Sequence, residues 1–354
     1  MSTAIVSDLH LGVSSDADVA RRPEALERLC AALERADRVV VLGDLLELRE
    51  RRAEVVLERA APILKAIGAA VAGRELVLVA GNHDYELVAP ALERARLDGR
   101  EELPVNGVYR VHENDLAGRV AALMGGPELT LAYPGLRLRE DVWATHGHYA
   151  DLHLTVPRIE SVFAHTVARI VGANGPVPGV DSYEAALSPV YAFSHGIAQS
   201  ARSNGAVRGG NTSRQVWVRA SGGGVSGFAL GRVAIPAAVG VLNGLGLGTF
   251  RPDISAVELR RGGLRAMGTV VRDLGVEADH VLFGHTHRAG PLPGEVEGWW
   301  QPGGVRLHNT GNWVLETAFD AGSGPDNPYW PGRVTWVDDD GPPRFENVLA
   351  GMEL

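Results

Sequence analysis

The chain has 354 residues, of which 45% are hydrophobic, so it can bury a substantial core as one large or two ordinary domains. Its formal net charge of -9 excludes the broad basic surface that drives nonspecific binding to nucleic acid. Cys30 is the only cysteine, which excludes an intramolecular disulfide. The first residues lack the basic segment and long apolar stretch of a signal peptide, so we expect a cytoplasmic protein.

Up to about residue 150, strand-like and helix-like segments alternate, which is typical of an α/β fold. The elements expected there are a strand over 3–7, a helix over 23–36, a strand over 38–42, a helix over 53–71 and a strand over 75–80. Short strands rich in Val, Leu and Trp return around 280–284, 305–310 and 333–337, between Gly/Pro turns. We expect residues 1–150 and 278–354 to form one core.

Residues 151–277 differ in composition and are interpreted as an inserted, partly helical cap. Helical patterns lie near 156–171 and 183–200, and Gly-rich loops lie at 203–213 and 221–227. Within this region Val233–Phe250 carries no charge, but Pro236 and several glycines interrupt it, which argues against a transmembrane helix. It is either a buried cap helix or an apolar lid that contacts a lipid-like substrate or the membrane surface, making the protein membrane-peripheral.

Five short motifs follow apolar, β-prone runs in a fixed order. They are Asp8-Leu9-His10, Gly43-Asp44, Gly81-Asn82-His83-Asp84, His146-Gly147-His148 and Gly284-His285-Thr286-His287. In α/β folds ligands bind at the carboxyl ends of strands, because there the backbone leaves the sheet and side chains can converge. The motifs therefore predict one site built from five loops.

The residue types in these motifs suit two divalent metal ions held close together. Such a pair needs one bridging carboxylate, together with nitrogen and oxygen ligands that leave positions open for water and substrate. Asp44 is the natural bridge, since its two oxygens can each face one cation. Asp8, His10 and His287 would complete one site, and Asn82, His146 and His285 the other.

The spacing of the ligands has a physical interpretation. Residues i and i+2 on extended backbone point the same way, so His285 and His287 can face one cluster, as can Asp8 and His10. Glycines at 43, 81 and 284 permit tight turns and a close approach of backbone to an anion. The amide of Asn82 is neutral, which keeps the negative charge of the site low enough to accept phosphate.

His83 directly follows a predicted ligand and is expected to project toward the substrate. We assign it to catalysis, protonating the leaving oxygen, with Asp84 beside it orienting the ring and raising its pKa. The nucleophile would be a metal-bridging hydroxide, because two cations lower the pKa of bound water.

These motifs resemble the signature of the calcineurin-like metallophosphoesterase superfamily, over residues 1–150 and 278–315. The resemblance implies a four-layer α/β/β/α sandwich, two β-sheets flanked by helices, with a dinuclear site at one edge. It also implies Mn²⁺, Fe or Zn²⁺ as metals; we favour Mn²⁺. Every expected position matches, which implies a competent enzyme.

Within the superfamily, Ser7–Gly12, Gly43–Glu47 and His146–Asp151 are similar to the UDP-2,3-diacylglucosamine pyrophosphatase branch. The sequence departs from that branch at His83, where arginine is typical, and at His148, where aspartate is typical. The cap is also longer, so that exact substrate is not carried over.

We expect a phosphohydrolase acting on a small phosphodiester, phosphomonoester or diphosphate, with a lipid-linked nucleotide pyrophosphatase as the alternative. His148, Arg208 and Arg214 are candidates for substrate binding, although local packing or a solvated loop explains them as well. A nuclease would need a basic track beside the metals, so no nucleic-acid partner is expected. A protein phosphatase has weaker support, since its shallow site would have to remain open beneath a long insertion. A metal-binding scaffold would be expected to have lost ligands, and none is missing.

Overall fold

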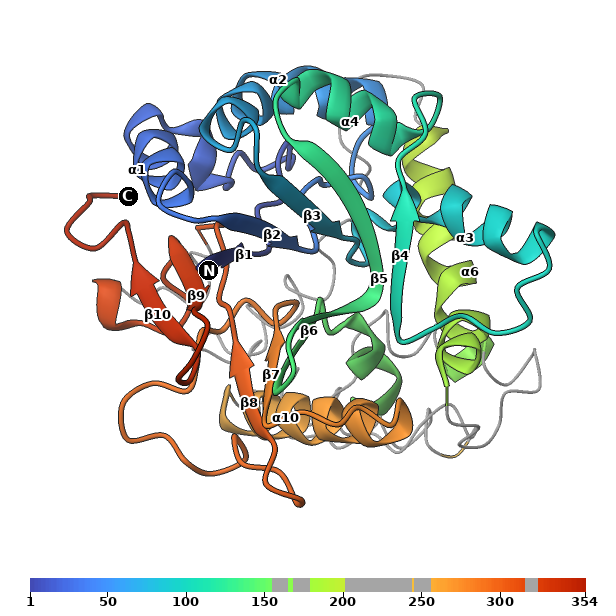
Figure 1. The fold of residues 1–354 in the computed structure, drawn as a ribbon, viewed down its shortest axis with the longest axis vertical. Helices are drawn as coiled ribbons and strands as arrows, with labels where there is room; N and C mark the ends of the chain where they lie inside the picture. Colours follow the sequence, from blue (N-terminus) through green and yellow to red (C-terminus); the bar gives the residue numbers. More distant parts are fainter. Residues whose placement is uncertain (155–164, 168–178, 201–243, 245–255, 316–323) are drawn as a thin grey trace, which may run out of the picture. The chain divides into compact units, whose positions relative to one another are not determined.

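The computed structural model describes residues 1–154, 165–167, 179–200, 244, 256–315 and 324–354 (Figure 1). The chain divides into two compact units. The first comprises Met1–His148, Ser194–Val207 and Glu277–Leu354, and the second comprises Tyr149–Phe193 and Arg208–Val276. The boundaries expected for the core and the cap remain a prediction.

Three parallel strands begin the first unit: β1 (Thr3–Val6), β2 (Arg38–Leu42) and β3 (Glu75–Val79). Their interiors are buried almost throughout, as expected for runs of Val, Leu and Ile covered on both faces. The helices between them are α1 (Pro23–Leu33) and α2 (Ala53–Ala70), as the sequence predicted.

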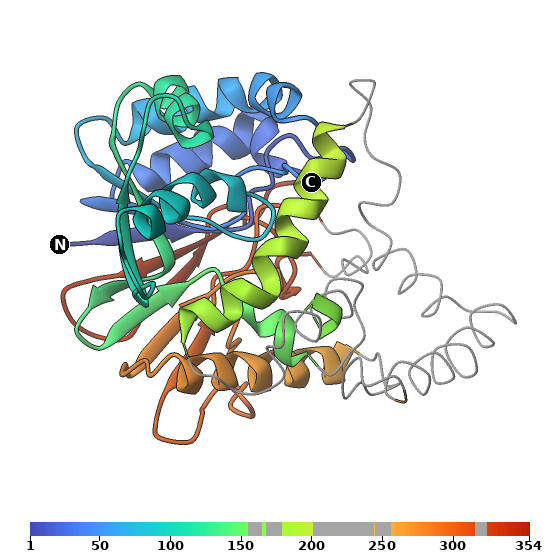
Figure 2. The ribbon, with the colours of Figure 1, turned by 90° about the vertical axis from the view of Figure 1, so that its right-hand side faces the viewer.

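Helices α1, α2 and α4 (Leu116–Met124) lie together on one side of these strands (Figures 1 and 2). Pro23 occupies the first turn of α1, where its missing N–H costs no hydrogen bond. The same helix buries Leu29 and Leu33 on its inner face. Gly125 ends α4 in the left-handed region, at φ 67°, where glycine is favoured.

The long strand β5 (Glu128–Arg139) joins two halves of a curled sheet. Its first residues pair with β3 in parallel, and its last residues pair with β6 (Val142–Thr145) in antiparallel register. The remaining strands are β4 (Asn106–Arg110), β7 (His280–Phe283), β8 (Arg306–Asn309), β9 (Arg333–Val337) and β10 (Arg344–Asn347). The strand order is β10-β9-β1-β2-β3-β5-β6-β7-β8, with β4 paired to β5. The α/β class is confirmed.

An apolar cluster draws side chains from both halves of the sheet. It includes Val40 and Val77 from the first half, Val142 and Leu282 from the second, and Leu136 from the shared strand. Because both halves contribute to one core, the loops at their carboxyl ends are held by the same packing.

The first unit also contains the short helix α3 (Ala89–Leu97) and the 3-10 turns η1 (Val19–Arg21), η2 (Tyr85–Leu87) and η5 (Gly324–Asp326). The second unit contains most of η3 (His148–His153) and of α6 (Val180–Gln199), as well as α10 (Ala256–Asp273). Helix α6 was expected from the sequence, whereas α10 was not.

No helix in the described part of the chain is long and apolar enough to cross a membrane. The uncharged segment Val233–Phe250 lies outside the described residues except for position 244, so its alternatives stay open. Most of the helix expected over 156–171 and both Gly-rich loops also lie outside them.

Candidate metal centre

The five motifs occupy loops that follow five strands of the first unit. Strands β1, β2 and β3 are parallel neighbours, and β6 and β7 form a second parallel pair. Since parallel strands end at the same edge of a sheet, their following loops converge. The predicted ligands all lie in these loops: Asp8, His10, Asp44, Asn82, His146, His285 and His287.

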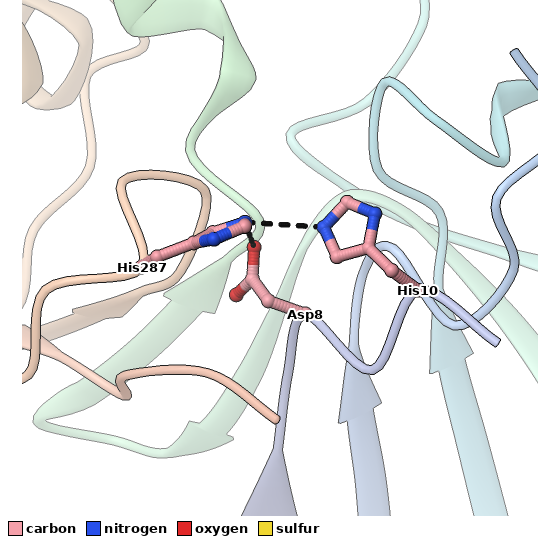
Figure 3. A group of neighbouring side chains, drawn as sticks. All are labelled: Asp8, His10 and His287. Atoms are coloured by element: carbon pink, nitrogen blue, oxygen red, sulfur yellow. Dashed lines mark hydrogen bonds and ion pairs between the residues drawn. The ribbon is translucent and has the colours of Figure 1, made fainter. Parts of the chain in front are cut away.

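Asp8, His10 and His287 form one group of ligand types, and their candidate atoms lie within 4.8 Å of one another. Nε2 of His287 is 3.1 Å from Nε2 of His10 and 3.4 Å from Oδ1 of Asp8. Figure 3 shows the three side chains pointing toward one another from two separate loops. This is the grouping assigned from the sequence to one metal.

Asp44, His146 and His285 form a second group with the same compactness. Asn82 joins it, because its Oδ1 lies 3.1 Å from Nδ1 of His285. The two histidines of the Gly284-His285-Thr286-His287 motif therefore face different groups, one ring for each.

Asp44 lies between the two groups. Its Oδ2 is 3.2 Å from Nε2 of His146 and 3.6 Å from Nε2 of His10. Its Oδ1 accepts the backbone N–H of His83 at 2.9 Å. Oδ2 thus lies near a ring from each group, and a bridge through both oxygens stays a prediction. Burial alone would raise the pKa of Asp44, but the nearby histidine rings hold it well below its ordinary value.

The arrangement of His146 tests whether these residues suit a metal. Its Nδ1 donates to the carbonyl of Leu42 at 2.9 Å, which in the neutral ring leaves the lone pair on Nε2. That atom is buried, has no hydrogen-bond partner among the described residues, and faces a carboxylate oxygen of Asp44. A neutral ring would place two acceptors face to face in a buried site, which suits a cation between them, so the donor set fits a divalent metal. Without a cation a proton takes that place, because burial alone would lower the pKa of His146 but the charge of Asp44 outweighs it and raises that pKa to about 9.

The backbone of the ligands is unusual. Asp8, His10, Asp44, His285 and His287 all have positive φ, between 45° and 66°. The expectation that i and i+2 converge because the backbone is extended is therefore wrong. Left-handed residues turn the chain sharply after β1, β2 and β7, and those turns bring the side chains together.

The glycines of the motifs make room for these side chains. A Cβ on Gly43 would overlap Nδ1 of His146, and one on Gly284 would overlap Oδ2 of Asp8. Gly43 also has φ 88°, which glycine adopts without strain. The glycine requirement thus comes from the ligands as well as from the turns.

Glu47 is a site residue that the sequence reasoning missed. Its Oε2 accepts from Nδ1 of His83 at 2.6 Å and from Nδ1 of His10 at 3.1 Å. Burial would raise the pKa of Glu47, but the charge of His83 and bonds from both rings hold it well below its ordinary value. A single acid within the apolar run from Leu45 to Leu48 was the available signal, since a buried acid needs partners.

Asp84 does not orient the ring of His83 as expected. Its Oδ1 accepts the N–H of Gly81 at 2.7 Å, and its Oδ2 accepts those of Leu45 and Leu46 at 2.7 and 3.3 Å. It therefore ties the loop after β3 to the loop after β2. Burial and the nearby charge of Asp44 raise the pKa of Asp84 to about 7.

Of the three candidate substrate-binding residues, His148 is the one that belongs to the described part of the chain. His148 is buried, with Nε2 at 2.9 Å from the hydroxyl of Tyr133, and its ring lies 5.6 Å from that of His146. Arg208 and Arg214 fall outside the described residues. Their binding roles stay predictions.

The model of the family described as calcineurin-like phosphoesterase matches residues 1–186, more than half of the chain. The protein belongs to this family. Members act as metal-dependent phosphohydrolases, and the family implies a dinuclear divalent metal centre, in keeping with two ligand groups that meet at Asp44. No curated protein is significantly similar to the sequence.

Solved structures give more distant likenesses. A cold-active protein-tyrosine phosphatase of a psychrophilic Shewanella species is 12% identical, with a TM-score of 0.31, over 97% of this chain and 80% of that one. A dimetal phosphatase from Danio rerio is 12% identical, with a TM-score of 0.33, over 95% of each chain. Likeness at this level does not indicate a substrate.

Proposed function

We propose that this calcineurin-like phosphoesterase hydrolyses a small phosphodiester, phosphomonoester or diphosphate, and that residues 151–277 form a cap that selects the substrate. The observation that carries the proposal is the pair of ligand groups sharing one oxygen of Asp44, with His83 beside them. The substrate is a small phosphorylated molecule, and we place the protein in the cytoplasm.

One metal would be held by Asp8, His10 and His287, and the other by Asn82, His146 and His285, with Asp44 shared. Bound divalent cations supply an activated water nucleophile and neutralise charge on the phosphoryl group. The mixed nitrogen and oxygen ligands accommodate Mn²⁺, Fe and Zn²⁺, and we propose Mn²⁺ as the working metal.

His83 is placed to move a proton during the reaction. Its backbone N–H donates to Asp44, and its Nδ1 faces Glu47, so the ring is fixed at one edge. The side chain keeps 23% of its surface exposed, whereas His10 and His146 are buried, so a substrate can reach the ring. His83 would protonate the leaving oxygen from Nε2.

A lipid-linked nucleotide pyrophosphatase is the second candidate. It is favoured by the similarity of Ser7–Gly12 and His146–Asp151 to the UDP-2,3-diacylglucosamine pyrophosphatase branch. It would explain an uncharged segment in the cap, which would cover an acyl chain or touch a membrane. His83 and His148 depart from that branch, so we rank it second.

Hydrolysis of bis-p-nitrophenyl phosphate with added Mn²⁺ tests the proposal, with Asp44→Asn as the control. We expect cleavage by the wild type and loss of both metal and activity in the variant. An Asp44→Asn protein that remained fully active would contradict the shared-carboxylate site. Cleavage of a UDP-linked diacyl sugar in preference to the simple ester would favour the second candidate.

A further inference from the structure

Arg49 contacts the candidate site without being a predicted ligand. It lies in the loop between β2 and α2, and its Nη1 is 3.4 Å from Nε2 of His83. Its backbone N–H donates to Oε1 of Glu47 at 3.0 Å, so the loop position is fixed by the same carboxylate that holds His83. A guanidinium and an imidazole thus meet at the exposed edge of the site.

The position of the hydrogen on the His83 ring determines what this contact implies. Glu47 can only accept, so the hydrogen of the neutral ring resides on Nδ1 and the lone pair on Nε2. That lone pair faces the guanidinium of Arg49. For His83 to protonate a leaving oxygen, substrate must replace Arg49 as the partner of Nε2. Arg49 therefore marks where substrate oxygens arrive.

We propose, on the basis of the function proposed above, that Arg49 binds the reacting phosphoryl group. We further propose that it makes the site prefer a doubly charged phosphoryl group over the singly charged group of a diester. The preferred substrates would be phosphomonoesters, or diphosphates cleaved at a terminal phosphate.

The chemistry of the two donors supports this preference. Nη1 of Arg49 and a protonated Nε2 of His83, 3.4 Å apart, can each donate to a different oxygen of one phosphoryl group. Arginine stays charged at all working pH values and its planar fork matches phosphate oxygens. In a partly buried site a cation attracts a dianion more strongly than a monoanion. Loss of Arg49 should therefore lower activity on the monoester more than activity on the diester.

The test compares Arg49→Gln and Arg49→Lys with Arg52→Gln in the Mn²⁺-loaded enzyme. Arg52 belongs to the same loop, but its side chain is 40% exposed and pairs with Glu54, so it serves as the matched control. The substrates are p-nitrophenyl phosphate and bis-p-nitrophenyl phosphate at about pH 8, where the monoester is a dianion. Thermal unfolding and metal content establish that each variant is folded and loaded.

We expect Arg49→Gln to lower kcat/KM for the monoester roughly 10- to 100-fold, and for the diester only a few-fold. Arg49→Lys keeps the charge and should recover part of the monoester activity, while Arg52→Gln should match the wild type. Equal losses on the two substrates, or none on either, would overturn the assignment.

Binding of inorganic phosphate separates this proposal from the function on which it rests. Calorimetry should give a Kd at least about tenfold higher for Arg49→Gln than for the wild type. If the wild type cleaved neither ester, the proposed function would fail, but the phosphate affinity would still decide the role of Arg49. An unchanged affinity in Arg49→Gln would then refute it.

Discussion

Oε2 of Glu47 lies 2.6 Å from Nδ1 of His83 and 3.1 Å from Nδ1 of His10. One buried carboxylate oxygen thus connects the ring proposed for proton transfer with a ring proposed for metal binding. Both rings must donate to it from Nδ1. The Nε2 atoms are then left for metal binding by His10 and for proton transfer by His83.

Replacing Glu47 with glutamine should therefore impair two properties at once. The amide removes the negative charge that both rings face, and with its oxygen at the position of Oε2 its NH₂ opposes the backbone N–H of Arg49. We therefore expect a fall in turnover and in metal affinity of roughly 10- to 100-fold each. Steady-state kinetics and metal titration by calorimetry measure the two effects separately.

His83→Ala is the comparison for that variant. It should retain both metals and lose turnover by roughly 10²-fold or more, because only proton transfer is removed. A Glu47→Gln enzyme with unaltered metal affinity would show that the carboxylate serves His83 alone.

Asp84→Asn should destabilise the protein rather than change its chemistry selectively. The carboxylate accepts three backbone N–H groups, and an amide NH₂ would face one of these donors. We expect a loss of about 2 to 4 kcal/mol in the free energy of unfolding. Denaturant unfolding measures it, with the exposed Asp98→Asn as the control. Unchanged stability with reduced turnover would instead return Asp84 to a catalytic role.

Gly43→Ala should empty the metal site that contains His146. The added Cβ would overlap the imidazole of His146, whereas the same change at Gly73 meets no atom within 4 Å. Both positions have positive φ, so Gly73→Ala controls for backbone strain alone. Metal analysis should find one ion in the first variant and two in the second. Two ions in both would show that His146 has room to move.

His308 should make the protein sensitive to acid. Burial, then the charges of His280 and Arg306, lower the pKa of His308 to about 3. Between about pH 6.5 and pH 3 the unfolded chain binds a proton that the folded chain does not. The free energy of unfolding therefore decreases as the pH is lowered through this range, by up to about 1.4 kcal/mol per pH unit.

The measurement is the free energy of unfolding of the metal-free protein across that range. His308→Gln should flatten the slope relative to the wild type, and the exposed His112→Gln should leave it unchanged. Parallel slopes for His308→Gln and the wild type would show that His308 is charged in the folded state.

The strands and the residue types of the site were predictable because each motif directly follows an apolar run. Backbone conformation was not: spacing alone suggested extended chain at His285 and His287, whereas both are left-handed. Adjacency misled in the case of Asp84, since the turn after Asn82 points neighbouring side chains in different directions. Glu47 was visible as an acid in an apolar run, but its two partners come from other loops and require the fold.

The left-handed ligands also bear on engineering. Asp8, His10, Asp44, His285 and His287 hold a conformation that costs an L-residue on the order of 1 to 2 kcal/mol. Glycine would relieve that cost at every one of these positions. A library of variants screened only for heat resistance would therefore enrich glycine substitutions that remove the metal ligands and with them the activity. Improvement of this enzyme should keep those five codons fixed and seek its gains in the outer helices.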